Sequence, residues 1–280
     1  MRLVNTNTGL GALIGPDNDE VADLTALAPD VITLISGGTD AIDAARRAVA
    51  DAPRRPLASL RLDAPIRRPP KFLGLGMNYA AHVAEAGRER PEHQVWFNKQ
   101  STCVIGPDQP IVVPGVSTMV DYEGELGVVI GTRCRHVPRE RARDVVAGWT
   151  VVNDVSARDW QWRTPQWTLG KSFDTHGPMG PALVTIDELA DPDGLSLRTW
   201  VNGDLRQDAT TDDMIFHVWD MVAELSTVFT LEPGDVLATG TPSGCGFALD
   251  PPDFLEEGDT VRIEIEGVGV LENPVTAERD

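Results

Sequence analysis

Apolar residues in this chain occur mostly in short runs that end at glycine, proline, asparagine or aspartate. Such runs are typical of β-strands joined by turns, because strands are short and turns favour those residues. The runs lie at residues 3–4, 12–14, 21–24, 72–76, 95–99, 111–113, 126–130, 149–152, 197–201 and 260–271. Asn202-Gly203-Asp204 follows one of them and is a strong hairpin signal. The pattern therefore predicts a β-rich fold.

Helical periodicity is found in a few segments. Apolar residues recur at helical spacing from Ile215 to Phe229, which predicts the longest helix of the chain and a core-packing role for it. Residues 41–50 predict a second helix, with Thr39 as its candidate N-cap. A helical turn is expected at residues 79–86, where Gly87 would end it. Helices among many strands indicate the α+β class.

The sequence pattern before residue 65 differs from the pattern after it. Residues 1–65 contain short strands and the helix at 41–50, but no group of residues suited to catalysis. Prolines between residues 53 and 70 are typical of a linker. We therefore expect a small N-terminal α+β domain at 1–65 and a catalytic domain at 70–280.

Composition narrows the class of protein. A chain of 280 residues, 41% of them hydrophobic, can bury a sizeable core, and its net charge of −19 disfavours nucleic acid and anionic membrane as partners. Three cysteines in no metal-binding spacing favour a reducing compartment. The N-terminus lacks an apolar signal segment, and no run is long enough to span a bilayer. We expect a cytoplasmic protein.

The acidic start of the strand at residues 121–130 is the first candidate site. Alternate residues of a strand share a face, so Glu123 and Glu125 would lie on the same side. Two carboxylates held that close repel each other unless a proton or a cation lies between them. A solvated strand edge is the alternative interpretation.

A third carboxylate, Asp154, follows the strand at 149–152. Together with Glu123 and Glu125 it would supply three oxygen ligands, which suit a hard divalent ion: Mg²⁺ above all, with Mn²⁺ or Ca²⁺ as alternatives. Such a site could chelate a 2-oxo acid through its carboxylate and keto oxygens. The spacing alone leaves open whether the three side chains converge.

Two further features are candidates for chemistry. His82 and Glu85 are three residues apart, so on a helical turn they share a face and can form a base with its orienting carboxylate. A surface capping pair is the alternative. Gly74 and Gly76 lack the third glycine and the long helix of a dinucleotide-binding loop. Lys99 ends a strand and could be either a solvated lysine or an anion-binding one.

Five motifs in order resemble the fumarylacetoacetate hydrolase superfamily, over roughly residues 70–273. They are Gly76-Met77-Asn78-Tyr79 with His82 and Glu85, Glu123-Gly124-Glu125-Leu126, Asn153-Asp154 with Arg158 and Gln161, Gly170-Lys171-Ser172-Phe173-Asp174, and Gly240-Thr241-Pro242-Ser243-Gly244. The resemblance implies a β-rich roll of mixed β-sheets of that family's C-terminal-domain type. It also implies a homodimer.

The resemblance also assigns roles. Glu123, Glu125 and Asp154 would be the metal ligands, and His82 with Glu85 would be the dyad that activates water. Lys171 matches the lysine that binds substrate oxygens or a developing oxyanion. The remaining matches are to substrate-binding positions, namely Lys99, Arg158, Gln161 and Thr241.

These parts imply a divalent-metal-dependent hydrolase that cleaves the C–C bond of an acylpyruvate or a related β-diketo acid through a metal-stabilised enolate, in aromatic-compound catabolism. An isomerase or decarboxylase of an unsaturated 2-oxo dioate would use the same residues. A catalytically silent binding protein on the same fold is a third alternative, and the joint presence of His82, Glu85, the three carboxylates and Lys171 speaks against it. The products of turnover would discriminate among the three.

Some positions depart from the family pattern. His176 stands where an apolar or aromatic residue is common, and it could contact substrate or be a satisfied loop histidine. Cys245 replaces a small aliphatic residue, and we interpret it as a buried, inert thiol. The segment at residues 86–94 could form a lid that sets specificity. Clustered tryptophans at 160, 162 and 167 could wall a pocket, although such clusters more often form core or interface.

Overall fold

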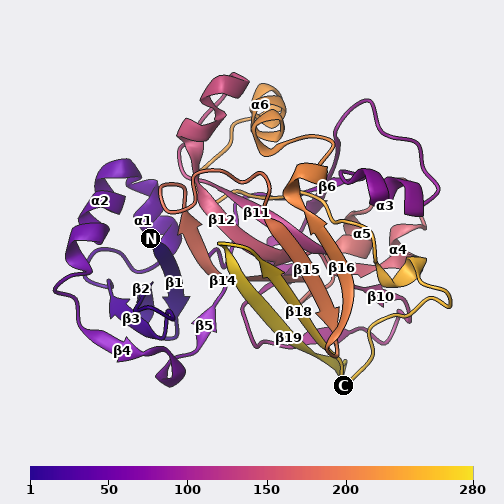
Figure 1. Ribbon diagram of the computed structural model, residues 1–280, viewed down its shortest axis with the longest axis horizontal. Coiled ribbons are helices and arrows are strands. Elements are labelled where there is room, and N and C mark those ends of the chain that lie inside the picture. The colour runs from indigo at the N-terminus through magenta and orange to yellow at the C-terminus, as the bar shows by residue number, and fades with distance from the viewer. Residues whose placement is uncertain (280) are drawn as a thin grey trace.

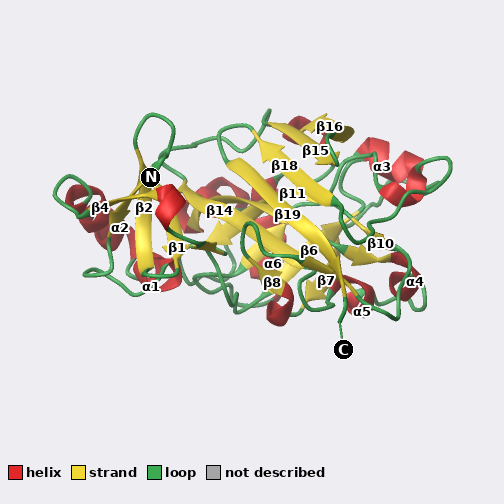
Figure 2. Ribbon diagram, turned by 90° about the horizontal axis from the view of Figure 1, so that it is seen from below, coloured by secondary structure: helices red, strands yellow, loops and turns green. Residues whose placement is uncertain are grey.

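The computed structural model describes residues 1–279, and β-sheets dominate it (Figures 1 and 2). Two large sheets and one two-stranded ladder contain both parallel and antiparallel pairs, which confirms the predicted β-rich, mixed-sheet α+β class. The strands of the larger sheet are β1 (Arg2–Thr6), β2 (Gly9–Ile14), β3 (Glu20–Asp23), β4 (Arg54–Pro56), β5 (Leu62–Asp63), β6 (Phe72–Gly76), β7 (Val95–Lys99), β8 (Val104–Ile105), β11 (Gly124–Ile130), β12 (Val146–Asn153), β14 (Gly177–Thr185) and β17 (Val236–Ala238).

The second sheet has five strands and lies against the middle of the first. Its strands are β9 (Ile111–Val113), β15 (Ser196–Val201), β16 (Asp204–Thr210), β18 (Thr260–Ile265) and β19 (Gly269–Ala277). The short ladder pairs β10 (Val120–Asp121) with β13 (Ser156–Ala157). The predicted hairpin at Asn202-Gly203 is confirmed, since β15 and β16 pair antiparallel on either side of it.

Strand β11 lies in the middle of the larger sheet, whose order is β4-β3-β2-β1-β14-β12-β11-β17-β6-β7. Every residue of β11 is buried, because both faces of the sheet are covered. Val128 faces the core between the two sheets, and its neighbour Val129 faces the core on the opposite side, near helix α1. Because successive side chains of the strand point to opposite faces of the sheet, β11 packs an apolar face on each side. This packing holds the acidic residues at its start in fixed positions.

The helices are short and lie at the periphery of the sheets (Figure 2). Their bounds are α1 (Val31–Ser36), α2 (Gly38–Ala48), α3 (Ala80–Glu85), α4 (Arg158–Gln161), α5 (Thr168–Lys171) and α6 (Val218–Val228). Short 3-10 helices are η1 (Leu57–Ser59), η2 (Ser101–Cys103), η3 (Arg139–Val145), η4 (Thr211–Asp213) and η5 (Gly246–Ala248). Helix α6 confirms the predicted helix and packs its apolar face into the core, but it begins at Val218 because His217 has extended dihedrals.

The predicted cap of the helix near residue 41 is wrong. Helix α2 begins at Gly38 with Gly37 as its N-cap, so Thr39 already lies in the first turn. Gly37 also ends α1, and Gly38 has a φ of +68°, a conformation that glycine adopts without strain. The two glycines therefore join the helices in a tight corner that leaves no separate capping residue.

The N-terminal strands continue the larger sheet. Strand β1 pairs antiparallel with β14 at Arg2–Val184 and Leu3–Leu183, and α1 and α2 cover this end of the molecule, at the left of Figure 1. The predicted boundary near residue 65 falls in the connection between β5 and β6. The division into two domains stays a prediction.

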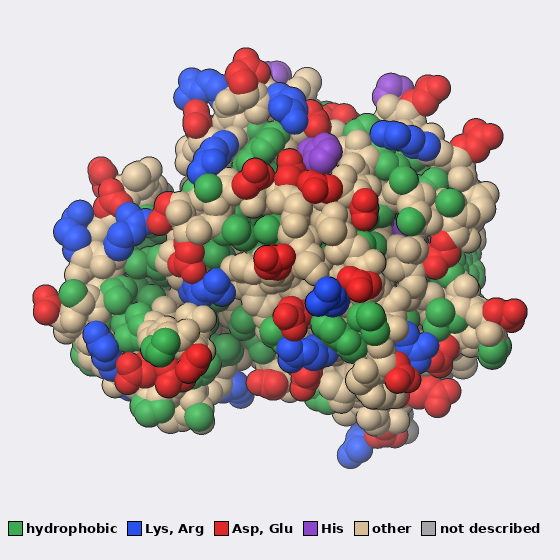
Figure 3. All heavy atoms as spheres, in the orientation of Figure 1, with side chains coloured by type: hydrophobic (Ala, Val, Ile, Leu, Met, Phe, Trp, Pro, Cys, Tyr) green, Lys and Arg blue, Asp and Glu red, His purple; other side chains and the backbone are tan. Residues whose placement is uncertain are grey.

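The surface is mixed in charge. Figure 3 shows acidic and basic side chains interspersed over the face that it presents. None of the helices within residues 1–279 is long and apolar enough to cross a membrane.

Candidate active site

Three buried carboxylates converge where β11 begins and β12 ends. Glu123, Glu125 and Asp154 each offer an oxygen, and these oxygens all lie within 4.8 Å of one another. The antiparallel pairing of β11 with β12 sets Gly124 opposite Asn153, and the Asp154 N–H donates to the Glu123 carbonyl (2.9 Å). The structure thus brings together the three side chains that the sequence singled out.

The acidic strand is interrupted, which the sequence did not predict. The run at residues 121–130 was expected to be one strand, but β10 ends at Asp121 and β11 begins at Gly124. Side-chain amides bind the backbone at the break: Glu123 N–H donates to Asn153 Oδ1 and Gly124 N–H donates to Gln207 Oε1, both at 3.0 Å. These two hydrogen bonds take the place of strand-to-strand hydrogen bonds at the break and fix the position of Glu123 there.

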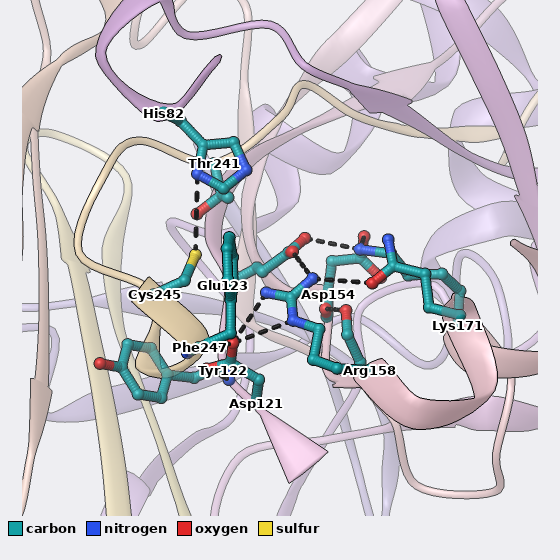
Figure 4. A network of polar contacts seen from close by, with 12 residues as sticks. His82, Asp121, Tyr122, Glu123, Asp154, Arg158, Lys171, Thr241, Cys245 and Phe247 are labelled. Atoms are coloured by element: carbon teal, nitrogen blue, oxygen red, sulfur yellow. Dashed lines mark hydrogen bonds and ion pairs between the residues drawn. The ribbon is translucent and has the colours of Figure 1, made fainter. Parts of the chain in front are cut away.

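Cationic side chains surround the carboxylates (Figure 4). Lys171 Nζ lies 2.7 Å from both Glu123 Oε2 and Asp154 Oδ2. Arg158 Nη1 lies 2.6 Å from Glu123 Oε1, while its Nε donates to Asp121 Oδ2 at 2.9 Å. Burial of these five charged groups is compensated by the ion pairs, since an isolated buried charge is costly.

The protonation of the carboxylates is uneven. Burial raises and the neighbouring Lys171 and Arg158 lower the pKa of Glu123, and the cations prevail, so its pKa lies well below the usual range. Burial, then the charges of Asp154 and Glu123, raise the pKa of Glu125 well above its ordinary value. Glu125 accepts the Gly240 N–H (2.8 Å) and has no ion-pair partner among residues 1–279. The cluster therefore carries uncompensated negative potential at Glu125.

Lys99 lies behind the carboxylates. Its ammonium donates to Asp154 Oδ1 (2.6 Å) and to the carbonyl oxygens of Val155 and Lys171. The side chain is fully buried and does not line the pocket described below. These contacts support a role in holding Asp154 and the end of α5, and contact of Lys99 with substrate stays a prediction.

Helix α3 carries the histidine–glutamate pair. His82 Nδ1 lies 3.3 Å from Glu85 Oε2, as the three-residue spacing predicted. The other carboxylate oxygen of Glu85 accepts the Gly244 N–H at 2.9 Å, and the ring of Phe247 meets the His82 ring edge-on. Glu85 is thus tied at both oxygens, which fixes the orientation of the imidazole.

A pocket of about 720 Å³ opens onto the carboxylates. Seven of the ten predicted site residues line it, namely His82, Glu123, Glu125, Arg158, Gln161, Lys171 and Thr241. Gln161 is held by a hydrogen bond from Arg158 Nη1 (3.0 Å). Thr241 Oγ1 donates to the Gly124 carbonyl (3.1 Å) and accepts from Gln207 Nε2 (2.8 Å). Glu85, Asp154 and Lys99 support the residues that face the cavity.

Aromatic rings and two arginines form the outer wall of the pocket. Trp162 and Trp167 line it, whereas Trp160 lies outside and stacks on the Arg163 guanidinium at 3.7 Å. Arg88 and Arg163 also line the pocket, and neither forms an ion pair with any residue in the 1–279 range. The outer wall therefore combines apolar aromatic rings with two arginine charges that no carboxylate of the described chain neutralises.

The structure shows where the residues that depart from the family pattern lie. His176 is fully buried, bonds the Val112 carbonyl through Nε2 (3.0 Å) and lies outside the pocket lining, which favours the structural interpretation. Cys245 is fully buried, and burial, together with the nearby Asp121, raises its thiol pKa. The segment at 86–94 contributes Ala86 and Arg88 to the pocket.

Sequence reasoning missed three residues of the site. Asp121 accepts hydrogen bonds from Arg158 and from the Gly246 and Phe247 N–H groups, and so joins two loops. The Tyr122 hydroxyl donates to the Gly244 carbonyl (2.9 Å), and Phe247 packs its ring 4.7 Å from the Arg158 guanidinium carbon. Asp121 and Tyr122 belong to the acidic run, but nothing in their spacing indicates partners more than thirty residues away.

Comparison with known proteins identifies the family of this chain. Residues 71–276 match the family model described as fumarylacetoacetate (FAA) hydrolase C-terminal. The chain is 44% identical over 252 residues to oxaloacetate tautomerase Fahd2a, mitochondrial, of Rattus norvegicus, covering 89% of this chain and 80% of the relative.

Solved structures match along the whole chain. Maleylpyruvate hydrolase from Sphingobium sp. SYK-6, in complex with manganese(II) ion and pyruvate, has a TM-score of 0.86 at 35% identity and covers 100% of both chains. The 5-carboxymethyl-2-hydroxymuconate delta-isomerase of Mycobacterium smegmatis has a TM-score of 0.82 at 38% identity and covers 99% of this chain and 100% of its own. The fold expected from the resemblance is confirmed, and the chain belongs to the fumarylacetoacetate hydrolase family.

Proposed function

We propose that this protein is a divalent-metal-dependent hydrolase that cleaves the C–C bond of an acylpyruvate or a related β-diketo acid. The observation that carries the proposal is the meeting of two units on one pocket. Glu123 and Glu125 of the carboxylate cluster line this pocket with Asp154 close beside them, and His82, which Glu85 orients, lines it as well. The relatives described above are named as a hydrolase, an isomerase and a tautomerase. Each of these reactions suits a site that binds a 2-oxo acid.

The donor set fits a hard cation. Three buried carboxylates and no nitrogen or sulfur donor suit Mg²⁺, with Mn²⁺ or Ca²⁺ as alternatives, and a structural relative holds manganese(II) with pyruvate. Burial and the neighbouring charges of Asp154 and Glu123 raise the pKa of Glu125, and a cation bound among the three carboxylates would oppose that rise. When bound, the cation would supply Lewis-acid polarisation of the substrate's oxygens.

The residues of the chain would deliver the water. His82 Nδ1–H donates a hydrogen bond to Glu85, so the ring carries no proton on Nε2. Nε2 can therefore take a proton from water as the water attacks the distal carbonyl of the acylpyruvate. The bond between that carbonyl carbon and the pyruvate methylene then breaks. The carboxylic acid leaves with the oxygen of water, and the methylene carbon of the pyruvate enolate takes up a proton. Lys171 and Arg158 stabilise the enolate oxygen and the substrate carboxylate.

A tautomerase or isomerase is the second candidate. The 44% identity to an oxaloacetate tautomerase and the likeness to a muconate isomerase favour it. Keto–enol exchange or a double-bond shift moves a proton and needs no attacking water, so the same Lys171 and carboxylate cluster would serve both reactions.

Turnover of three substrates tests the proposal. We would assay acetylpyruvate, fumarylpyruvate and oxaloacetate, each with Mg²⁺, Mn²⁺ or EDTA, and follow pyruvate and its co-product. Pyruvate with an equal amount of carboxylic acid, abolished by EDTA, is the expected result. Enol-to-keto conversion of oxaloacetate without pyruvate release would replace the hydrolase with the tautomerase. Pyruvate and CO₂ from oxaloacetate alone would make the protein a decarboxylase.

The assembly state and location are separate proposals. The homodimer and the cytoplasmic location stay predictions from the sequence. Light scattering of the purified protein in solution would test the first.

A further inference from the structure

The loop at residues 244–247 lies beside the imidazole of His82, where Cys245 and Phe247 face the ring (Figure 4). Gly244 N–H donates to Glu85 Oε1 at 2.9 Å, and Gly246 N–H donates to Asp121 Oδ1 at 2.8 Å. Cys245 lies between these two anchored glycines, and its Sγ is 4.0 Å from His82 Nδ1. The thiol is therefore fixed toward the histidine rather than free to turn away.

The donor atoms around this thiol differ in kind from those of the carboxylate cluster. A ring nitrogen of His82, Cys245 Sγ and a carboxylate oxygen of Glu123 all lie within 4.8 Å of one another, and Glu85 Oε2 lies 3.3 Å from His82 Nδ1. Sulfur, imidazole nitrogen and carboxylate oxygen are the ligands that Zn²⁺ takes, at bond lengths of about 2.0–2.3 Å. In a tetrahedral site those lengths put sulfur and nitrogen roughly 3.5 Å apart, so the thiol and Nδ1, now 4.0 Å apart, would approach by about half an ångström, and the Glu123 oxygen would move in from its place within 4.8 Å.

We propose that His82, Cys245 and Glu123 form a second metal site, one that takes a borderline-soft divalent cation such as Zn²⁺ and inhibits the enzyme. Glu123 belongs both to this site and to the carboxylate cluster, so the two sites are adjacent. Mg²⁺ and Mn²⁺ favour oxygen ligands, whereas thiolate selects the softer ion. The type of ligand atom thus determines which cation binds at each site. The oxygen site takes the cation that supports turnover, and the site with the thiolate takes the cation that inhibits it.

The binding step balances without any redox partner. The Cys245 thiol loses its proton to solvent as its sulfur binds the cation, and one proton is released for each cation bound. His82 gives its Nδ1 lone pair, so the ring proton resides on Nε2. Glu123, already ionised, contributes one oxygen.

Inhibition follows from the tautomer, and this step rests on the proposed function. With the cation on Nδ1, the proton on Nε2 prevents that nitrogen from accepting another from water. The hydrogen bond from Nδ1 to Glu85 is lost at the same time. Binding itself does not depend on the reaction that the enzyme catalyses.

Co²⁺ is the spectroscopic probe for the site, because a cobalt–thiolate bond gives a near-ultraviolet charge-transfer band that oxygen ligands do not. We would titrate the full chain, held in excess Mg²⁺, with Co²⁺. The band is expected in the wild type and in Cys134→Ala, which removes a half-buried thiol elsewhere, and it is expected to be absent in Cys245→Ala. No band in the wild type, or a band that survives in Cys245→Ala, would overturn the site. Circular dichroism would verify that each variant is folded, and His82→Gln, which keeps the thiol, should weaken Co²⁺ binding about tenfold or more.

Zinc titration of turnover tests the inhibition, with each variant compared with its own rate before zinc is added. The Zn²⁺ concentration that halves the Mg²⁺-supported rate should rise about tenfold or more in Cys245→Ala and stay unchanged in Cys134→Ala. Equal sensitivity of wild type and Cys245→Ala would place the inhibition at the carboxylate cluster and refute the proposal. If the protein hydrolyses none of the substrates, the Co²⁺ spectrum still decides whether the site exists.

Discussion

Glu123 and Glu125 are the same residue type, two positions apart, yet their surroundings give them opposite electrostatic roles. Glu123 binds Lys171 and Arg158, so its charge is needed to compensate two buried cations. Glu125 lies beside two other carboxylates with no cation of its own, and burial, then the charges of Asp154 and Glu123, raise its pKa. A metal ion would relieve the repulsion at Glu125, whereas Glu123 is already compensated.

This difference predicts opposite effects on stability. Glu123→Gln should lower the free energy of unfolding by about 3–5 kcal/mol, because it removes one carboxylate partner from each of two buried cations and leaves Lys171 with Asp154 alone and Arg158 with Asp121 alone. Glu125→Gln removes a repelling group and should leave the metal-free protein as stable as the wild type or more so. Both variants should lose Mn²⁺ binding. Urea denaturation in EDTA and calorimetric titration with Mn²⁺ measure the two properties, and equal destabilisation by both substitutions would refute the assignment.

His82 permits a test that separates the two proposed reactions. His82→Ala should abolish hydrolysis, because no group would remain to take the proton from water. Keto–enol exchange, which needs no attacking water, should persist at a reduced rate. Deuterium exchange into pyruvate, followed by NMR, reports the second activity. Equal loss of both activities would show that His82 does not act through water.

The buried His176 predicts a pH dependence of stability. Burial lowers its pKa from 6.5 to about 3 in the folded protein, and the hydrogen bond to Val112 only partly opposes this. Between these two values the unfolded chain binds a proton that the folded protein does not. Stability is therefore unaffected by this group above pH 6.5 and falls as the pH drops below it, by at most about 1.4 kcal/mol per pH unit. His176→Gln should show a shallower fall between pH 6.5 and 4.5 in urea denaturation. An unchanged slope would mean that another group carries the dependence.

Short apolar runs predicted the elements well, because period-two burial is local information. The strands β6, β7, β12 and β15 lie where their runs indicated, and α6 follows its helical spacing. The failures occur where another segment intervenes. Gly37 and Gly38 displaced Thr39 as a cap, and the amides of Asn153 and Gln207 divided the acidic strand. The second of these failures depends on residues far apart in sequence, which no local pattern contains, whereas the first lies in the adjacent corner at Gly37 and Gly38.

The candidate site shows the same limit. Convergence of the three carboxylates depends on the pairing of β11 with β12, which the family motifs implied but the spacing did not. The position of Lys99 behind Asp154, and of Asp121 between two loops, follows only from tertiary packing. Sequence therefore identified the reacting groups better than the residues that hold them.

The connection between α4 and α5 predicts a substrate preference. Arg163 is held against the Trp160 ring and lines the pocket without a carboxylate partner in the described chain, so it could bind the far carboxylate of a diacid. Arg163→Gln should raise KM for fumarylpyruvate roughly tenfold and leave KM for acetylpyruvate unchanged, since a charge-assisted hydrogen bond contributes about 1.5 kcal/mol or more. Arg163→Lys, which keeps the charge, should recover part of the loss. Equal effects on both substrates would indicate a structural role.

Across the whole molecule, the carboxylates link the strands that form the centre of the fold. Glu123 immediately precedes β11, Glu125 is its second residue, Asp154 follows β12, and both strands are buried on both faces. A cation bound there is bound only by the folded chain. Mn²⁺ at a hundred times its dissociation constant should therefore raise the free energy of unfolding by about 2.7 kcal/mol, and the melting temperature by roughly 5 °C. EDTA should reverse the shift and Glu125→Gln should not show it, as followed by circular dichroism. A shift of the same size in Glu125→Gln would place the stabilising cation elsewhere on this acidic protein.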